Sequence, residues 1–172
     1  MRGWILPALL VAALASPALA QQQGQQGQPQ RARIAKGSPI AKIFFAEPPL
    51  ILEDDGTYAG AIQRVGKEVS RECGAVESYG WDFKGKDREQ QQQQAYAVYD
   101  STMQALEKAG YKLAEKKVRS IPDPETLVFT AERQENRLLL MWSPVQDATL
   151  LLICDAGTGA KSPPTKTPQG KK

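Results

Sequence analysis

The sequence contains no histidine, so it lacks both the commonest general base and the commonest transition-metal ligand. It also has no GxSxG or SxxK nucleophile motif and no glycine-rich phosphate loop. We therefore expect a protein that is not an enzyme and has no catalytic residues, no metal site and no cofactor. Because paired carboxylates alone can hydrolyse sugars, a carboxylate-based hydrolase is the most distant alternative.

Long hydrophobic runs are also scarce, and the longest is at the start of the chain. Arg2 precedes an apolar stretch from Trp4 to about Ala15, and small residues follow at Ala18–Ala20. This stretch is shorter than the roughly 20 residues that a membrane-spanning helix needs. We therefore predict a signal peptide over residues 1–20 and, after its cleavage, a periplasmic or secreted bacterial protein without a transmembrane span.

Cysteine occurs only twice, at Cys73 and Cys154. Exported proteins fold in oxidising compartments, where two cysteines favour a disulfide over free thiols. The sequence therefore predicts a Cys73–Cys154 disulfide, and the alternative is a pair of buried thiols.

Acidic residues are missing from both ends of the chain, because all 19 lie between Lys42 and Asp155. The ends carry only basic residues, which could tether an acidic domain to anionic lipid or cell-wall polymer. The plainer interpretation is that these lysines keep the ends solvated. The acidic centre argues against nucleic acid as a partner. The tether would use the lysines of the C-terminal end: Lys161, Lys166, Lys171 and Lys172.

Composition divides the chain into four parts. Residues 21–37 are rich in glutamine and glycine and residues 157–172 in proline and lysine, and neither part can bury enough apolar surface to fold. With the signal peptide removed, a disordered linker (21–37) and a disordered tail (157–172) flank a single domain over residues 38–156.

Two helices are predicted inside this domain. Over residues 88–109, Asp87 is a suitable N-cap with Gln90 in the capping-box position, and Gly110 is a left-handed stop. The expected apolar stripe there consists of Tyr96, Tyr99, Met103 and Leu106. A second apolar repeat predicts a helix over residues 58–73 with a stop at Gly74, and its two internal glycines suggest close packing on a sheet.

The remaining segments are typical of strands. Predicted strands at residues 40–47 and 50–53 precede the first helix, and residues 76–83 alternate so that Tyr79, Trp81 and Phe83 share one face. Short connections make the last four strands antiparallel neighbours. The fold class is therefore α+β, with two helices packed on a mainly antiparallel sheet that ends in a four-stranded meander. The meander strands are expected at residues 111–118, 126–133, 137–143 and 149–155.

Two short segments allow other interpretations. Clustered carboxylates at "LEDDGTY", residues 52–58, could bind calcium, but the ligand spacing fails and a turn into a hairpin or helix fits better. The aromatic and basic residues of "WDFKGKDR", residues 81–88, could stack on nucleic acid or sugar. Core packing by Trp81 is the more usual role.

The last two strands are apolar at consecutive positions, which indicates burial on both faces. If both helices lie on one face, the other face must meet the N-terminal strands, a second copy of the protein or an apolar ligand. We expect an exported, non-enzymatic envelope protein that binds another envelope protein or itself through this region. A carrier of a small apolar ligand or lipid is the alternative. The predicted interaction surface consists of Leu138, Leu140, Trp142, Leu150 and Leu152.

Overall fold

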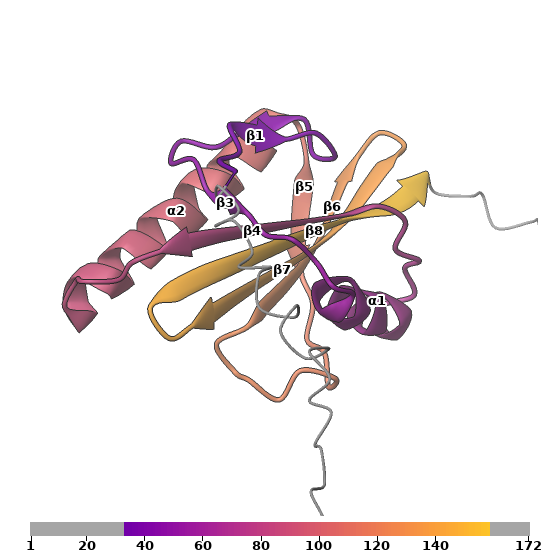
Figure 1. Cartoon of the computed structure of the whole chain (residues 1–172). Helices are drawn as coiled ribbons and strands as arrows, with labels where there is room; N and C mark the ends of the chain where they lie inside the picture. Colours follow the sequence, from indigo (N-terminus) through magenta and orange to yellow (C-terminus); the bar gives the residue numbers. More distant parts are fainter. Residues whose placement is uncertain (1–32, 159–172) are drawn as a thin grey trace, which may run out of the picture. The chain divides into compact units, whose positions relative to one another are not determined.

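The computed structural model describes residues 33–158 and confirms the α+β fold class (Figure 1). Six antiparallel strands form one sheet in the order β3-β4-β8-β7-β6-β5, and β1 and β2 form a separate hairpin. The predicted signal peptide, most of the linker and the four lysines of the tail lie outside the described residues. The helices are α1 (Thr57–Glu68) and α2 (Arg88–Lys108), and the strands are β1 (Gly37–Ser38), β2 (Ile43–Phe44), β3 (Leu50–Ile51), β4 (Val76–Asp82), β5 (Lys112–Glu115), β6 (Leu127–Arg133), β7 (Asn136–Val145) and β8 (Ala148–Thr158).

The predicted meander is confirmed, because β5, β6, β7 and β8 are consecutive neighbours in the sheet. Strand β4, which precedes α2 in the chain, pairs with β8 over its whole length. This pairing places two segments about 70 residues apart in sequence side by side in the sheet. The expected common face of Tyr79, Trp81 and Phe83 is also correct, since all three side chains are buried in one cluster.

The two helices lie on opposite faces of the sheet, and this explains why β7 and β8 are apolar at consecutive positions. Side chains of α2 and the β1–β2 hairpin pack on one face with Leu138, Leu140 and Trp142. Side chains of α1 pack on the other face with Leu139 and Leu152. The chain therefore covers most of both faces itself.

Helix α2 begins and ends as the sequence predicts. The Asp87 carboxylate accepts a hydrogen bond from the Gln90 N–H at 2.9 Å. Gly110 has a φ of 90°, and the Tyr111 N–H donates to the Leu106 carbonyl, which is a Schellman ending.

The predicted stripe of α2 is wrong at its first position. Tyr96 is exposed, whereas Val98, Thr102 and Leu106 form the buried line of the helix. Tyr99 and Met103 lie beside this line and are partly buried. The apolar spacing of Tyr96, Tyr99, Met103 and Leu106 is that of a helix face, but the buried face includes the smaller Val98 and the polar Thr102 instead of Tyr96.

Helix α1 ends earlier than predicted, at Glu68 instead of Cys73. Ser70 takes a left-handed conformation with a φ of 56°, and the Arg71 N–H donates to the Gly66 carbonyl at 2.7 Å. Serine is an unusual residue for this position, so the sequence carried no clear stop signal. The chain then runs back over the sheet to Cys73.

The two glycines of α1 differ in their surroundings, and this predicts opposite effects of alanine. A Cβ at Gly66 would lie 2.7 Å from the Arg71 carbonyl oxygen, which is backbone and cannot move aside cheaply. We expect Gly66→Ala to destabilise the protein by about 1–3 kcal/mol. At Gly60 only the flexible Arg64 side chain is close, so Gly60→Ala should stabilise it by about 0.5–1 kcal/mol. Urea unfolding of the two variants checks this, and equal effects would contradict the packing described.

Residues 33–37, which we expected in the linker, belong to the folded part. The Ala35 N–H donates to the Pro49 carbonyl at 2.8 Å, and the Ile51 N–H donates to the Arg33 carbonyl at 2.7 Å. Ile34 forms a bridge with Leu50 between these bonds. The segment thus extends the sheet beyond β3, an interaction between distant residues that composition does not reveal.

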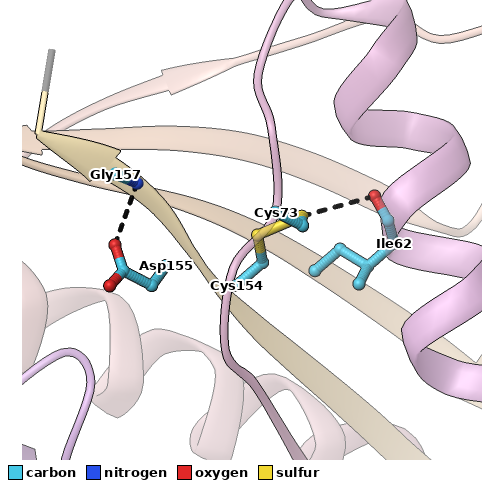
Figure 2. Close-up of a disulfide and its surroundings, with 5 residues drawn as sticks. All are labelled: Ile62, Cys73, Cys154, Asp155 and Gly157. Atoms are coloured by element: carbon cyan, nitrogen blue, oxygen red, sulfur yellow. Dashed lines mark hydrogen bonds between the residues drawn. A yellow bond between two sulfur atoms is a disulfide. The ribbon is translucent and has the colours of Figure 1, made fainter. Parts of the chain in front are cut away.

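Cys73 and Cys154 form the predicted disulfide, with their Cα atoms 5.5 Å apart (Figure 2). Cys154 is fully buried on β8, and the Cys73 sulfur lies 3.8 Å from the Ile62 carbonyl oxygen of α1. The bond therefore attaches the segment that follows α1 to a central strand of the sheet.

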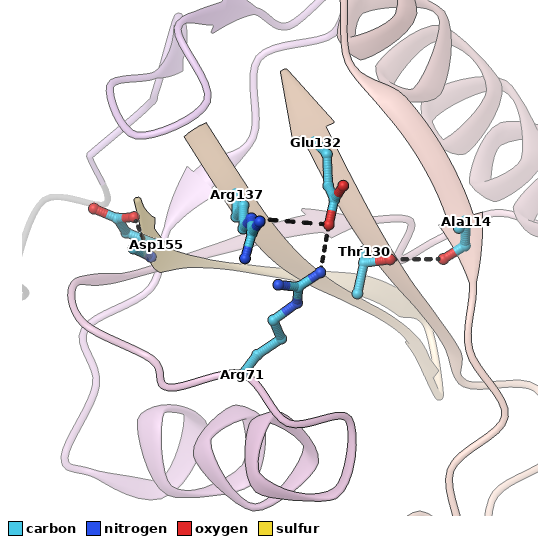
Figure 3. A network of polar contacts seen from close by, with 7 residues as sticks. Arg71, Ala114, Thr130, Glu132, Arg137 and Asp155 are labelled. Carbon is cyan, nitrogen blue, oxygen red and sulfur yellow. Dashed lines mark hydrogen bonds and ion pairs between the residues drawn. The ribbon is translucent and has the colours of Figure 1, made fainter. Parts of the chain in front are cut away.

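An ion-pair network attaches the same segment to the sheet at a second point (Figure 3). Arg71 pairs with Glu132 on β6, and Arg137 Nε lies 4.0 Å from the same Glu132 oxygen. Because the Glu132 side chain is half exposed, solvent screens this network and it adds little to stability.

Candidate binding groove

The structure places four of the five predicted interaction residues in the core. Leu138, Leu140 and Trp142 lie beneath α2, and Leu152 lies beneath α1. None of these four side chains is more than 6% exposed, so a partner cannot contact them on the folded domain. The fifth, Leu150, is half-buried at the edge of a groove.

The groove lies on the face of the sheet that α1 partly covers, at the end away from that helix. Gly80 of β4 pairs with Leu50 of β3 on one side and with Leu150 of β8 on the other, so these residues form one row across three strands. We call this feature the Leu150 groove, and its volume is about 570 Å³. Its main lining residues are Leu50, Leu52, Gly80, Val145, Ala148 and Leu150.

Gly80 shapes the floor of the groove because it has no side chain. A Cβ at this position would lie 3.2 Å from the Leu52 side chain, which occupies the space above the glycine. A glycine inside a strand often marks such a close approach. The glycine inside the predicted strand "VESYGWDF", residues 76–83, is therefore a signal for this site that the apolar pattern alone does not reveal.

The rim of the Leu150 groove is polar. Asp82, Lys84 and Asp147 surround its apolar floor, and Lys84 Nζ lies 3.5 Å from an Asp82 carboxylate oxygen. Asp147 accepts a hydrogen bond from the Gln91 side chain at 3.4 Å. An apolar centre with a polar rim is the usual composition of a protein-binding site.

A smaller hollow of about 230 Å³ lies on the same face, between α1 and the loop that joins β5 to β6. The Thr126 hydroxyl donates to Asp123 at 2.7 Å and lies 2.8 Å from the Ser143 hydroxyl. The hydrogen bond from Thr126 lowers the pKa of Asp123 below its ordinary value. These contacts fix the loop between β5 and β6.

The side chain of Glu68, at the end of α1, binds the backbone of the same loop. Its carboxylate accepts hydrogen bonds from the N–H groups of Arg119 and Ser120. The Arg119 N–H, followed by the Ser120 contacts, lowers the pKa of Glu68 below its ordinary value. The ionised form of Glu68 is therefore the one that orders the loop.

This predicts a loss of order in the loop at acid pH. A carboxyl whose pKa is lower in the folded state contributes stability above its unfolded pKa, roughly 4.3 for glutamate, and loses it as the pH falls further. We expect the Arg119 and Ser120 amides to lose protection from hydrogen exchange in that range, ahead of the amides of β7. In Glu68→Gln this pH dependence should be absent, and an unchanged profile in the variant would contradict the assignment.

The segment considered for calcium is a helix entry. The Asp54 carboxylate accepts hydrogen bonds from the N–H groups of Gly56, Tyr58 and Ala59, and Asp55 accepts one from Thr57. The side-chain and backbone groups of Thr57 lower the pKa of Asp55. The N-cap of α1 is Gly56, so both carboxylates bind N–H groups at the start of the helix from the two positions before the cap.

The aromatic segment considered for stacking on a ligand packs inside the domain. The Trp81 ring lies 5.3 Å from Trp142 and 5.6 Å from Phe45, measured between centroids. Its indole N–H donates to the Glu47 carbonyl at 2.8 Å. The interpretation of Trp81 as a core residue is therefore confirmed.

Comparison with known proteins does not identify a function for this chain. No protein-family model matches the chain, and no curated protein or solved structure is significantly similar to it. Neither helix in residues 33–158 is long and apolar enough to cross a membrane.

Proposed function

We propose that this protein is an exported, non-enzymatic interaction module of a bacterial envelope, periplasmic or secreted, that binds an apolar segment of another envelope protein. The observation that carries the proposal is the uncovered apolar row at the Leu150 groove. Where α1, α2 and the β1–β2 hairpin cover the sheet its apolar side chains are buried, whereas at the groove apolar side chains of neighbouring strands still meet solvent.

The shape and chemistry of the groove favour a protein segment as its occupant. Leu50, Leu52 and Leu150 are half-buried and Val145 is exposed, so the groove is open along its length. Pockets for small molecules usually bury most of the ligand surface. An apolar side chain of a partner could lie beside Leu52, against Val145 and Leu150, while the partner's backbone and polar groups meet Asp82, Lys84 and Asp147 at the rim.

The disulfide is consistent with the proposed export of the protein from the cytosol. A disulfide between Cys73 and Cys154 persists in an oxidising compartment and is rare in the cytosol. The lysines of the C-terminal tail would add attraction to anionic lipid or wall polymer, which brings the domain close to envelope partners.

The proposal is tested with one charged substitution in the groove and one outside it, on α2. We expect Val145→Glu, which changes an exposed side chain, to abolish recovery of one defined envelope protein after chemical crosslinking in the producing cell. Tyr96→Glu on α2 is the matched control and should leave recovery unchanged. Equal recovery with both variants would refute the groove as the binding site.

A carrier function predicts a different result from the same protein. An organic extract of the purified mature protein would then contain one apolar molecule per chain, and Val145→Glu would remove it. An empty extract together with a partner protein dependent on Val145 supports the interaction module.

A further inference from the structure

The β1–β2 hairpin holds a large aromatic side chain in solvent. Gly37 pairs with Phe44, and Ser38 pairs with Ile43, so neighbouring pairs point to opposite faces of the hairpin. The inner face is buried, with Ser38 and Ile43 at most 5% exposed. On the outer face Phe44 is 82% exposed, the highest value among the large hydrophobic side chains exposed in residues 33–158.

Contacts on the inner face hold the hairpin in this orientation. The Ser38 hydroxyl and the Ile40 N–H both donate to the Glu77 carboxylate of β4. Phe45, the residue after Phe44, is buried with its ring edge-on to Trp81. Because the residues on both sides of Phe44 are fixed in the core, Phe44 cannot turn inward, and its exposure is built into the fold.

The hairpin and the four residues before it are the basic part of an otherwise acidic domain. Arg33, Lys36 and Lys42 are exposed, and no acidic residue precedes Glu47 anywhere in the chain. Ile34, between the first two of these basic residues, is 66% exposed. Exposed apolar side chains interspersed with basic ones are the composition of surfaces that bind the interface of anionic membranes.

We propose that the β1–β2 hairpin binds the surface of an anionic phospholipid bilayer, with Phe44 in the interface and Lys42 at the phosphate headgroups. A protein partner would need a pocket for so exposed a side chain, whereas a fluid lipid interface accepts it directly. The surface is distinct from the Leu150 groove and from the tail lysines. It would hold the domain at a membrane while the groove stays free.

Sedimentation with lipid vesicles tests the hairpin directly. The mature protein should bind vesicles of phosphatidylglycerol mixed with phosphatidylcholine, bind phosphatidylcholine vesicles much more weakly, and lose affinity as salt is added. Removing the Phe44 ring with Phe44→Ser should weaken binding by at least about tenfold. Lys42→Gln should weaken it by about fivefold, as expected for one basic side chain near an anionic surface.

Two control variants separate the hairpin from other sources of binding. Tyr96→Ser removes another exposed aromatic ring and should bind as the wild type does. Replacing Lys161, Lys166, Lys171 and Lys172 by glutamine should leave the effect of Phe44→Ser intact. Absence of vesicle binding, binding that depends only on the tail lysines, or equal loss in Tyr96→Ser would each overturn the proposal.

Insertion of the side chain has its own readout. Because Trp81 and Trp142 are buried, a Phe44→Trp variant adds the one exposed indole of the described residues. Lipids brominated in their acyl chains should quench this added fluorescence in anionic vesicles. Vesicle binding without quenching would show a purely electrostatic contact and would contradict insertion.

Discussion

Replacing Cys73 and Cys154 together by alanine is expected to lower the free energy of unfolding by about 2–5 kcal/mol. The bond joins residues 81 apart in sequence, so it closes a long loop in the unfolded chain. In the chain-entropy model a loop of this length corresponds to about 4–5 kcal/mol. The loop contains α2, the strands β4 to β7 and most of β8, so loss of the bond should affect the whole domain.

Urea unfolding of the oxidised protein, the reduced protein and the double variant measures this effect. Cys154 is fully buried next to the α1 cluster, so alanine also leaves a small cavity there. Comparison of the reduced wild type with the double variant separates the cavity from the covalent bond. A difference below about 1 kcal/mol between oxidised and reduced protein would show that the bond adds little.

Trp142→Ala is expected to cost about 3–5 kcal/mol, because it empties the centre of the aromatic core. The Trp142 ring lies 5.4 Å from Tyr99 of α2 and 5.3 Å from Trp81 of β4, between centroids. It therefore links the helix on this face to the sheet. If Trp142 were instead an exposed residue that contacts a partner, Trp142→Ala would change stability little and binding strongly.

Tyr96→Ala is the control for this prediction, since it removes an exposed ring from α2 and should change stability by no more than about 0.5 kcal/mol. Thermal unfolding of both variants decides between the two roles of Trp142. A similarly small loss of stability in both variants would support the predicted role of Trp142 in the interaction surface and contradict its role in the core.

Local signals predicted the elements of this fold better than their arrangement. Asp87 and Gly110 define both ends of α2 through contacts within a few residues, so the sequence was sufficient there. The end of α1 depends on a left-handed Ser70, a residue type that rarely takes that conformation. The packing of α1 and α2 on opposite faces and the pairing of β4 with β8 both join residues far apart in sequence, and no local pattern specifies either.

The candidate site shows the same division. The apolar runs in β7 and β8 correctly indicated two buried faces, but they could not show which residues the helices cover. Leu150 was identified, and it lies in the groove because α1 packs over Leu152 and leaves the next residue on that face free. Gly80 and Leu52 join it only through strand pairing, so their contribution became visible in the structure.

Site-specific photo-crosslinking in the producing cell tests the central claim most directly. A photoreactive amino acid would replace Val145 at the Leu150 groove or, as a control, Tyr96 on α2, since both side chains are exposed. The proposed function predicts that position 145 crosslinks to an apolar segment of one defined envelope protein and that position 96 does not. Crosslinks from both positions to the same mixture of proteins, or none from position 145, would contradict it.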